Sequence, residues 1–219
     1  MPHRLMFVCA MNVCRSPLMA FTFADALSSD NEDDANWSVI SRGTSVLRSD
    51  PMCDISASLI TSSDSGQKFA KGHESRPLVS AELQAQDLIL VASRAERAKI
   101  AQMNPRLRSR TFTVREALAL GAPAVTPADL ELIARSRVPH QKNRLDGYTQ
   151  LLHQRRGMVP LPAPRRSLLA FRAPADPSDI PDVHHQKRSQ HTSTLRAAQT
   201  EVRGLHTQIM AFLAARSEL

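Results

Sequence analysis

The sequence lacks any long hydrophobic run. No stretch approaches the roughly 18 apolar residues of a membrane-spanning helix, so no membrane partner is expected. The first residues lead directly into a predicted strand and do not resemble a signal peptide. Cysteine is scarce as well: the chain of 219 residues contains three, an odd number that does not suit a disulfide framework. These absences predict a cytoplasmic protein.

Aromatic residues are few, at 4 % of the chain, with one tryptophan and one tyrosine. The net charge of +7 could suit a nucleic-acid partner, but the excess is local. Nine Lys and Arg residues and one acidic residue, Asp146, lie between Arg135 and Arg172. This region has no regular interleaving of aromatic side chains for base stacking. We therefore expect no nucleic-acid partner, since an anionic substrate or a solvated basic face explains the charge equally well.

Internal repeats and metal-ligand spacings are also missing. His184, His185 and His191 lie close together in the sequence, but they lack cysteine or acidic partners at a known metal-site spacing. The sequence therefore predicts neither a metal ion nor another cofactor.

One stretch near the start of the chain carries recognisable chemistry. Four apolar residues that end at Cys9 predict a buried strand, and Leu18–Leu27 predicts a helix with Ser16 as its N-cap. A loop that enters a helix N-terminus directs backbone N–H groups and the positive end of the helix dipole at an anion. Arg15 adds a planar fork for two phosphate oxygens, and the same positive field favours the thiolate of Cys9. This arrangement predicts phosphoryl transfer through a cysteinyl-phosphate. The alternative is two buried structural cysteines beside a surface arginine.

The string Phe7-Val8-Cys9-Ala10-Met11-Asn12-Val13-Cys14-Arg15-Ser16-Pro17 resembles the signature of the low-molecular-weight protein tyrosine phosphatases. That family typically has Val-Cys-Leu-Gly-Asn-Ile-Cys-Arg-Ser-Pro here. The chain shares the second cysteine and the loop asparagine, and it departs at Met11, where the family usually has glycine. The resemblance implies that Cys9 is the nucleophile. It also implies a phosphate-binding loop made of Ala10, Met11, Asn12, Val13, Cys14, Arg15 and Ser16.

Two further segments resemble the same family. Ser41-Arg42-Gly43-Thr44 is similar to a Ser-Ala-Gly-Thr-like turn, and Lys71 to Leu78 is similar to a Gly-His-x-Ala/Ser-Arg-x-Leu segment. The resemblance implies that Asn12, Ser16, Ser41 and His73 form a hydrogen-bonded set that braces the loop, with Asn12 in a left-handed conformation. An ordinary turn at Ser41 and a surface histidine at position 73 are the alternatives.

The predicted order of strands and helices indicates an α/β fold. Strands are expected at Trp37–Ile40, Asp87–Ala92 and Thr111–Val114, with helices between them and right-handed parallel connections. The prediction is one three-layer domain over residues 1–219, with a four-stranded parallel sheet and the phosphate loop after its first strand. A basic, proline-rich insertion is expected at about 119–181. It has a helical part in one or two pieces and a loop or lid from Met158, followed by an amphipathic helix from Thr192 to Ala215.

The expected function is hydrolysis of phosphotyrosine in proteins, with inorganic phosphate as product. By resemblance, Arg15 holds the phosphoryl oxygens and an aspartate before the last helix protonates the leaving group. Asp176-Pro177 is the one Asp-Pro pair there, as the family pattern requires. Counting back from the terminal helix favours Asp182, which is preferred to Asp176 and then to Asp179.

Two alternative functions remain open. One is arsenate reduction by an enzyme of the same fold, although Leu78 to Leu118 contains no further cysteine for a thioredoxin-coupled type. The other is a phosphotyrosine-binding protein without turnover, suggested by Met11. Separately, Cys14 is predicted to form a protective disulfide with Cys9 after oxidation by peroxide.

Overall fold

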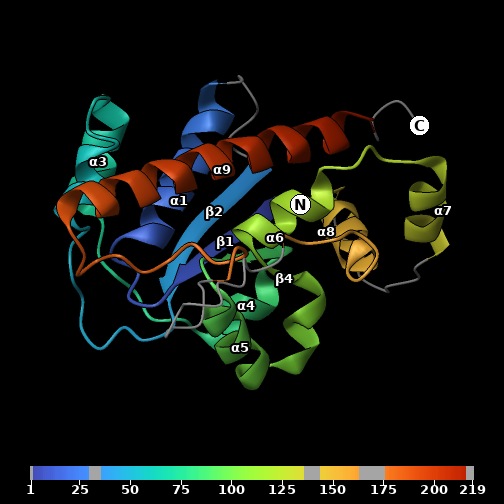
Figure 1. Ribbon diagram of the computed structural model, residues 1–219, viewed down its shortest axis with the longest axis horizontal. Helices are drawn as coiled ribbons and strands as arrows, with labels where there is room; N and C mark the ends of the chain where they lie inside the picture. The colour runs from blue at the N-terminus through green and yellow to red at the C-terminus, as the bar shows by residue number, and fades with distance from the viewer. Residues whose placement is uncertain (1, 30–35, 136–143, 163–175, 216–219) are drawn as a thin grey trace, which may run out of the picture.

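Four parallel strands form the centre of the protein in this computed structural model, which describes residues 2–29, 36–135, 144–162 and 176–215 (Figure 1). β1 (His3–Cys9) lies between β2 (Trp37–Gly43) and β3 (Leu88–Val91), and β4 (Thr111–Thr113) pairs with β3. All of these pairings are parallel. The predicted α/β fold with a four-stranded parallel sheet is therefore confirmed.

Helices follow each strand. In chain order they are α1 (Arg15–Ser29), α2 (Asp54–Ser58), α3 (Asp64–Gly72), α4 (Ser80–Ala85), α5 (Arg94–Met103), the 3₁₀ helix η2 (Pro105–Arg110), α6 (Val114–Gly121), α7 (Pro127–Arg135), α8 (Arg144–Arg155) and α9 (Arg188–Ala215).

The sheet is covered on both faces. Leu5 and Phe7 of β1 pack into a core with α1, α6, α8 and α9. Met6 and Val8 point to the other face, into a second core with α4, α5 and η2. Successive side chains of a strand point to opposite faces, and a parallel sheet is normally buried on both. The three-layer arrangement predicted from the sequence is thus present.

The helical part of the predicted basic insertion contributes to the core. It consists of α7 and α8, and residues 136–143 between these two helices lie outside the described part of the chain. Tyr148 and Leu152 of α8 are fully buried against the rest of the core. Buried Arg155 donates to the carbonyl oxygens of Leu120 and Pro123 and pairs with Asp129 at 2.9 Å. Part of the positive charge of this region therefore serves internal contacts.

The described residues before α9 lie at the edge of the sheet where the strands end, since the backbone N–H of Ile180 donates to the backbone oxygen of Ala92 at 2.8 Å. No helix or strand forms at the described residues 156–162 and 176–187, as the prolines predict, and residues 163–175 lie outside the described part. α9 begins at Arg188, four residues before the predicted start, and runs across α1 and α6 (Figure 1).

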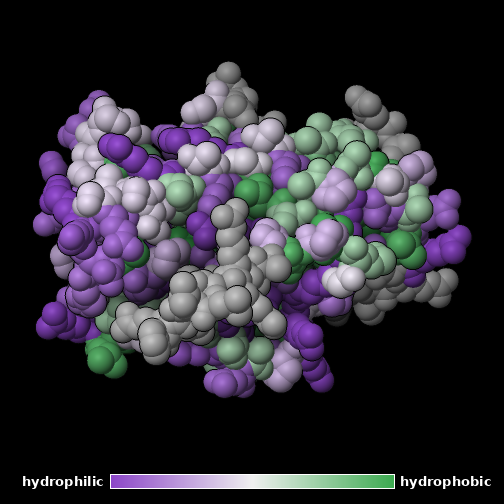
Figure 2. All heavy atoms as spheres, in the orientation of Figure 1, coloured by the Kyte–Doolittle hydropathy of each residue, from purple (hydrophilic) through white to green (hydrophobic). Residues whose placement is uncertain are grey.

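The outer surface is mixed. In Figure 2 hydrophilic residues predominate at the end that carries α3, while apolar residues are more frequent towards α7. None of the described helices combines the length and the apolarity of a membrane span.

Candidate active site

The loop after β1 lies at the point where the strand order reverses, because β2 and β3 flank β1. Open parallel sheets bind their ligands beyond the carboxyl ends of the strands at such a point. Cys9 ends β1 with 2 % of its surface exposed. Its Sγ atom lies 3.3 Å from the backbone nitrogen of Asn12 and 3.1 Å from the Oγ atom of Ser16. Both groups can donate a hydrogen bond to a thiolate.

Asn12 is the centre of the loop's support. Its backbone φ is 55°, the one positive value at a non-glycine residue among those described. Its side-chain Nδ2 donates to the Oγ atoms of Ser16 and Ser41, each at 2.9 Å. His73 Nε2 lies 2.8 Å from the backbone oxygen of Asn12. The structure thus brings together the four residues named from the sequence.

Two features of this network were not foreseen. The backbone N–H of Arg76 donates to Oδ1 of Asn12 at 2.9 Å, so every polar atom of that side chain has a partner. Burial lowers the pKa of the His73 imidazole below its usual range. The backbone φ of Met11 is not positive. Methionine therefore replaces the family's usual glycine at this position without the strain of a left-handed backbone conformation.

Gly43, the last residue of β2, lets the loop lie close to the sheet. A Cβ atom at this position would come within 2.8 Å of the backbone oxygen of Ala10 and 2.9 Å of the backbone nitrogen of Asn12. It would also meet Val46 Cγ2 at 2.5 Å. Since two of these neighbours are backbone atoms of the phosphate loop, they cannot move without changing the loop itself.

We therefore expect Gly43→Ala to lower kcat/KM for an aryl phosphate by between about tenfold and a hundredfold, because the loop amides lose their alignment. The matched control is Gly72→Ala at the end of α3, where a Cβ atom would meet nothing within 4 Å. Steady-state kinetics of both variants is the measurement. Equal activity of the two variants would show that the close approach of Gly43 does not matter.

The Arg15 guanidinium is held by three groups. It donates to the backbone oxygen of Ile180 at 3.1 Å and to Oδ2 of Asp182 at 2.5 Å. Glu96 Oε1 lies 3.8 Å from Nη2 of Arg15, and both side chains are 6 % exposed. Ser93 donates a hydrogen bond to Glu96 in turn. Glu96 was not found from the sequence, because it lies 81 residues from Arg15 on a helix of ordinary polar pattern.

We expect Glu96→Gln to lower kcat by roughly tenfold, because the guanidinium loses a fixed charged neighbour and takes its catalytic orientation less often. Inorganic phosphate should inhibit the Glu96→Gln variant at least as strongly as the parent, because the substitution removes one negative charge near the anion site. Glu131→Gln, in an exposed pair with Arg135, is the control. A weaker phosphate affinity with unchanged kcat would contradict a positioning role for Glu96.

Of the three candidate acids, one lies beside Arg15. Asp182 lines the same pocket as Cys9, and its side chain is 53 % exposed. Asp176 instead pairs with Arg94 at 2.9 Å and accepts the N–H of Ser178. Asp179 accepts the backbone N–H of Arg94 at 2.8 Å. Asp176 and Asp179 therefore fix the chain against the start of α5, while Asp182 faces the pocket.

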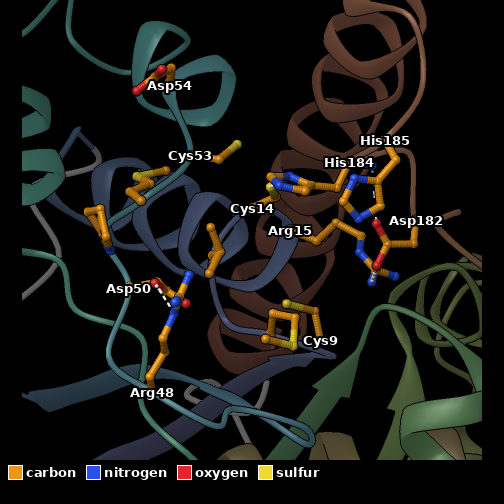
Figure 3. A pocket seen from close by; sticks show the side chains of 14 residues that line it. Cys9, Cys14, Arg15, Arg48, Asp50, Cys53, Asp54, Asp182, His184 and His185 are labelled. Atoms are coloured by element: carbon orange, nitrogen blue, oxygen red, sulfur yellow. Dashed lines mark hydrogen bonds and ion pairs between the residues drawn. The ribbon is translucent and has the colours of Figure 1, made fainter.

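The pocket itself has a volume of about 620 Å³ (Figure 3). Arg15 and Asp182 lie on one side of it, and Cys9 lies below them. Its apolar lining comes from the phosphate loop and from the segment before α2, and consists of Met11, Val13, Pro51 and Met52. Among the described lining residues, the only aromatic rings are the imidazoles of His184 and His185.

A second thiol group lies on the far side of the loop. Cys14 Sγ is 2.9 Å from Nδ1 of His184, and the thiol of half-buried Cys53 lies within 4.8 Å of it. The neighbouring Cys53 thiol and burial raise the pKa of Cys14, and the neighbouring Cys14 thiol lowers the pKa of Cys53 to about 5. All three cysteines are free thiols. The predicted Cys9–Cys14 disulfide stays a prediction, and the thiol partner of Cys14 in the structure is Cys53.

The family model of the low molecular weight phosphotyrosine protein phosphatases matches residues 4–119. The chain belongs to this family. The match ends before α7, so Asp182 and the histidines near α9 lie beyond it. No curated protein sequence matches the chain.

Several solved structures share the fold of this chain. A mutant of YwlE from Bacillus subtilis aligns with a TM-score of 0.60 at 16 % identity, over 95 % of this chain and 99 % of that one. The low molecular weight protein tyrosine phosphatase of T. tengcongensis aligns with a TM-score of 0.56 at 14 % identity, over 93 % and 97 %. The YwlE arginine phosphatase of Geobacillus stearothermophilus aligns with 0.59 at 14 %, over 96 % and 94 %. At these identities the likeness shows the fold and leaves the substrate open.

Proposed function

We propose that this protein is a tyrosine phosphatase that transfers a phosphoryl group from phosphotyrosine to Cys9 and then to water. The observation that carries the proposal is the convergence of Cys9, Arg15 and Asp182 on one pocket. A nucleophile, an anion-binding guanidinium and a carboxyl group are the three parts that such a transfer needs. The family membership supports a phosphatase, and the residue roles are our proposal.

In the first step the Cys9 thiolate attacks phosphorus while the bond to the phenolic oxygen breaks. Arg15 and the N–H groups of the loop hold the three non-bridging oxygens. Asp182 gives its proton to the departing phenolate, which would otherwise be a poor leaving group. The N–H of Asn12 and the hydroxyl of Ser16, both near Sγ, stabilise the thiolate before the attack and after its release.

In the second step a water molecule attacks the phosphorus of the cysteinyl-phosphate. The Asp182 carboxylate takes a proton from this water, the sulfur–phosphorus bond breaks, and inorganic phosphate leaves. The free site holds Arg15 against Asp182 at 2.5 Å. A phosphoryl dianion competes for the guanidinium and so frees the carboxyl group for proton transfer.

The depth and lining of the pocket favour an aryl phosphate. Cys9 is almost fully buried, so a phosphoryl group must reach it from a long side chain rather than from a short serine side chain. Apolar Met11, Val13 and Met52 offer a surface for an aromatic ring. A phosphorylated guanidinium, the group implied by the arginine phosphatases among the similar folds, would place N–H donors against the same apolar side chains.

The test compares three matched peptides that carry phosphotyrosine, phosphoserine or phosphoarginine, with Cys9→Ser as the control. We expect kcat/KM for phosphotyrosine to exceed that for phosphoserine by more than about a hundredfold and that for phosphoarginine by more than about tenfold. A preference for phosphoarginine would overturn the tyrosine assignment and leave a phosphatase. Release of phosphate by Cys9→Ser at the parent rate would overturn the mechanism as well.

The two alternative functions make different predictions. An arsenate reductase would oxidise thiols in an arsenate-dependent manner and hydrolyse aryl phosphates slowly. A binding protein without turnover would bind vanadate but leave p-nitrophenyl phosphate intact. The negative φ of Met11 weakens the case for the second alternative, because the loop keeps its geometry there.

The proposed setting is a reducing cytoplasm, with a tyrosine-phosphorylated protein as partner. The three free thiols support it. No nucleic-acid partner is proposed, since Arg155 and Arg156 of the basic region are engaged with backbone oxygens and with Asp129 and Glu116.

A further inference from the structure

Four potential metal ligands meet beside the phosphate loop, outside the catalytic group. One ligand atom each from Cys14, Cys53, His184 and His191 lies within 4.8 Å of every other. Cys14 belongs to the phosphate loop, Cys53 is the N-cap of α2, and His191 lies in the first turn of α9. His184 lies between Asp182 and α9. Four separate segments therefore converge on one point, seen in part in Figure 3.

We propose that these four side chains bind one Zn²⁺ ion in a tetrahedral Cys₂His₂ site. Two thiolates and two imidazoles form a donor set typical of structural zinc, and sulfur ligands exclude Mg²⁺ and Ca²⁺. The inference goes beyond the proposed phosphatase function, which uses the thiol of Cys9 and the backbone of the phosphate loop but none of these four side chains.

The distances suit such an ion. With about 2.3 Å to sulfur and about 2.0–2.1 Å to nitrogen, a tetrahedral ion separates neighbouring sulfur and nitrogen ligands by about 3.5 Å. The Cys14 Sγ–His184 Nδ1 distance is 2.9 Å and the Cys53 Sγ–His191 Nε2 distance is 4.0 Å. The two values lie on either side of the required separation, and no two of the four ligand atoms are more than 4.8 Å apart.

Surrounding contacts orient the sulfur ligands. The backbone N–H of Ser56 donates to Cys53 Sγ at 3.4 Å, and the backbone N–H of Cys53 donates to the backbone oxygen of Val13 at 3.0 Å. The Ser56 hydroxyl donates to the backbone oxygen of Cys14 at 3.1 Å. Such outer contacts fix ligand direction and are a regular part of metal sites. Cys14 and His191 are buried, Cys53 is half-buried and His184 is exposed, so the ion would be shielded on the side of Cys14 and His191 and open towards the pocket.

The site has a direct structural consequence. His184 follows Asp182 by two residues, and its own N–H donates to Oδ1 of Asp182 at 3.2 Å. Cys14 precedes Arg15 in the phosphate loop. An ion held by these residues would therefore tie the segment that carries Asp182 to the loop, to α2 and to α9.

The first measurement is metal content. The full chain, purified without a polyhistidine tag under reducing conditions, is expected to carry one equivalent of zinc. After metal removal, added Co²⁺ should bind in the same ratio and give the visible d–d bands of a tetrahedral ion with a thiolate charge-transfer band. Absence of both zinc and the cobalt spectrum would overturn the proposal.

Variants test which residues bind. Cys53→Ser and His191→Asn should each weaken Co²⁺ binding by at least about a hundredfold, more than the loss of an outer contact costs. His185→Asn is the matched control, because His185 is next to His184 but outside the cluster, and it should keep the spectrum. Circular dichroism of each variant verifies folding. Retention of the full spectrum in both Cys53→Ser and His191→Asn would contradict the assigned ligands.

Cys9→Ser separates this proposal from the proposed function. It should lose phosphatase activity but keep the cobalt spectrum. Loss of the spectrum in Cys9→Ser would show that the ion uses the catalytic thiol, which would overturn the site. Recovery of the chain with a Cys14–Cys53 disulfide under reducing conditions would overturn it too. An active phosphatase without bound metal would refute the zinc site alone.

Discussion

Cys9→Ser is expected to lower kcat on an aryl phosphate by at least about four orders of magnitude, as the loss of a nucleophile does in other covalent enzymes. A serine hydroxyl stays protonated under conditions where a thiol in this positive loop supplies a thiolate. The hydrogen bonds from Asn12 and Ser16 stabilise an anion on sulfur but cannot ionise an alcohol. The measurement is steady-state hydrolysis of p-nitrophenyl phosphate.

The same variant should still bind oxyanions. Arg15, the loop amides and the brace around Asn12 remain, so titration calorimetry should show phosphate affinity within a few-fold of the parent. Retained binding shows that the loss of turnover is chemical rather than a failure to fold. More than about a hundredth of the parent turnover in Cys9→Ser would contradict the assignment of the nucleophile.

Asp182→Asn is expected to lower kcat by roughly two to four orders of magnitude on an aryl phosphate with a poor leaving group. The asparagine keeps the shape of the side chain but has no proton to give. On p-nitrophenyl phosphate the loss should be smaller, because that leaving group needs less assistance. KM should not rise, since removal of the carboxylate frees Arg15 from its partner at 2.5 Å.

Asp176→Asn is the matched control, with the same change six residues earlier. It loses the ion pair with Arg94 at 2.9 Å, on a part of the surface away from the pocket lining. We expect less than about a threefold change in kcat, in line with the small effect of a partly exposed pair. If Asp176→Asn lost activity and Asp182→Asn kept it, the general acid would be Asp176.

The phosphate loop could be predicted because its determinants are local. An apolar strand, a short loop and a helix start fix the position of Cys9 and Arg15 relative to each other within a few residues. The strands were predictable for a similar reason, since β1 and β3 are buried apolar runs. Helices α3 and α4 were not predicted. Two of the nine residues of α3 are glycines (Gly66 and Gly72), which disfavour a helix, and α4 has only six residues, too few to show a helical pattern.

The rest of the site depends on tertiary contacts that no local pattern encodes. Glu96 reaches Arg15 because β1 and β3 are neighbours, so that the helix after β3 begins beside the loop. The meeting of Cys14 with Cys53 and His191 joins residues up to 177 positions apart. Sequence spacing gave no metal signal for that reason. The choice of Asp182 came from counting back from α9, and the structure places this residue against Arg15, although its catalytic role remains a proposal.

The most direct test of the mechanism is to trap the intermediate and locate the phosphoryl group. Asp182→Asn, mixed with p-nitrophenyl phosphate, should still form the cysteinyl-phosphate but should hydrolyse it slowly, because the carboxylate that activates water is missing. Rapid quenching followed by phosphorus NMR and peptide mass spectrometry should then find one phosphoryl group per chain, on Cys9. A phosphoryl group on another residue, or turnover without any phosphoenzyme, would contradict the account.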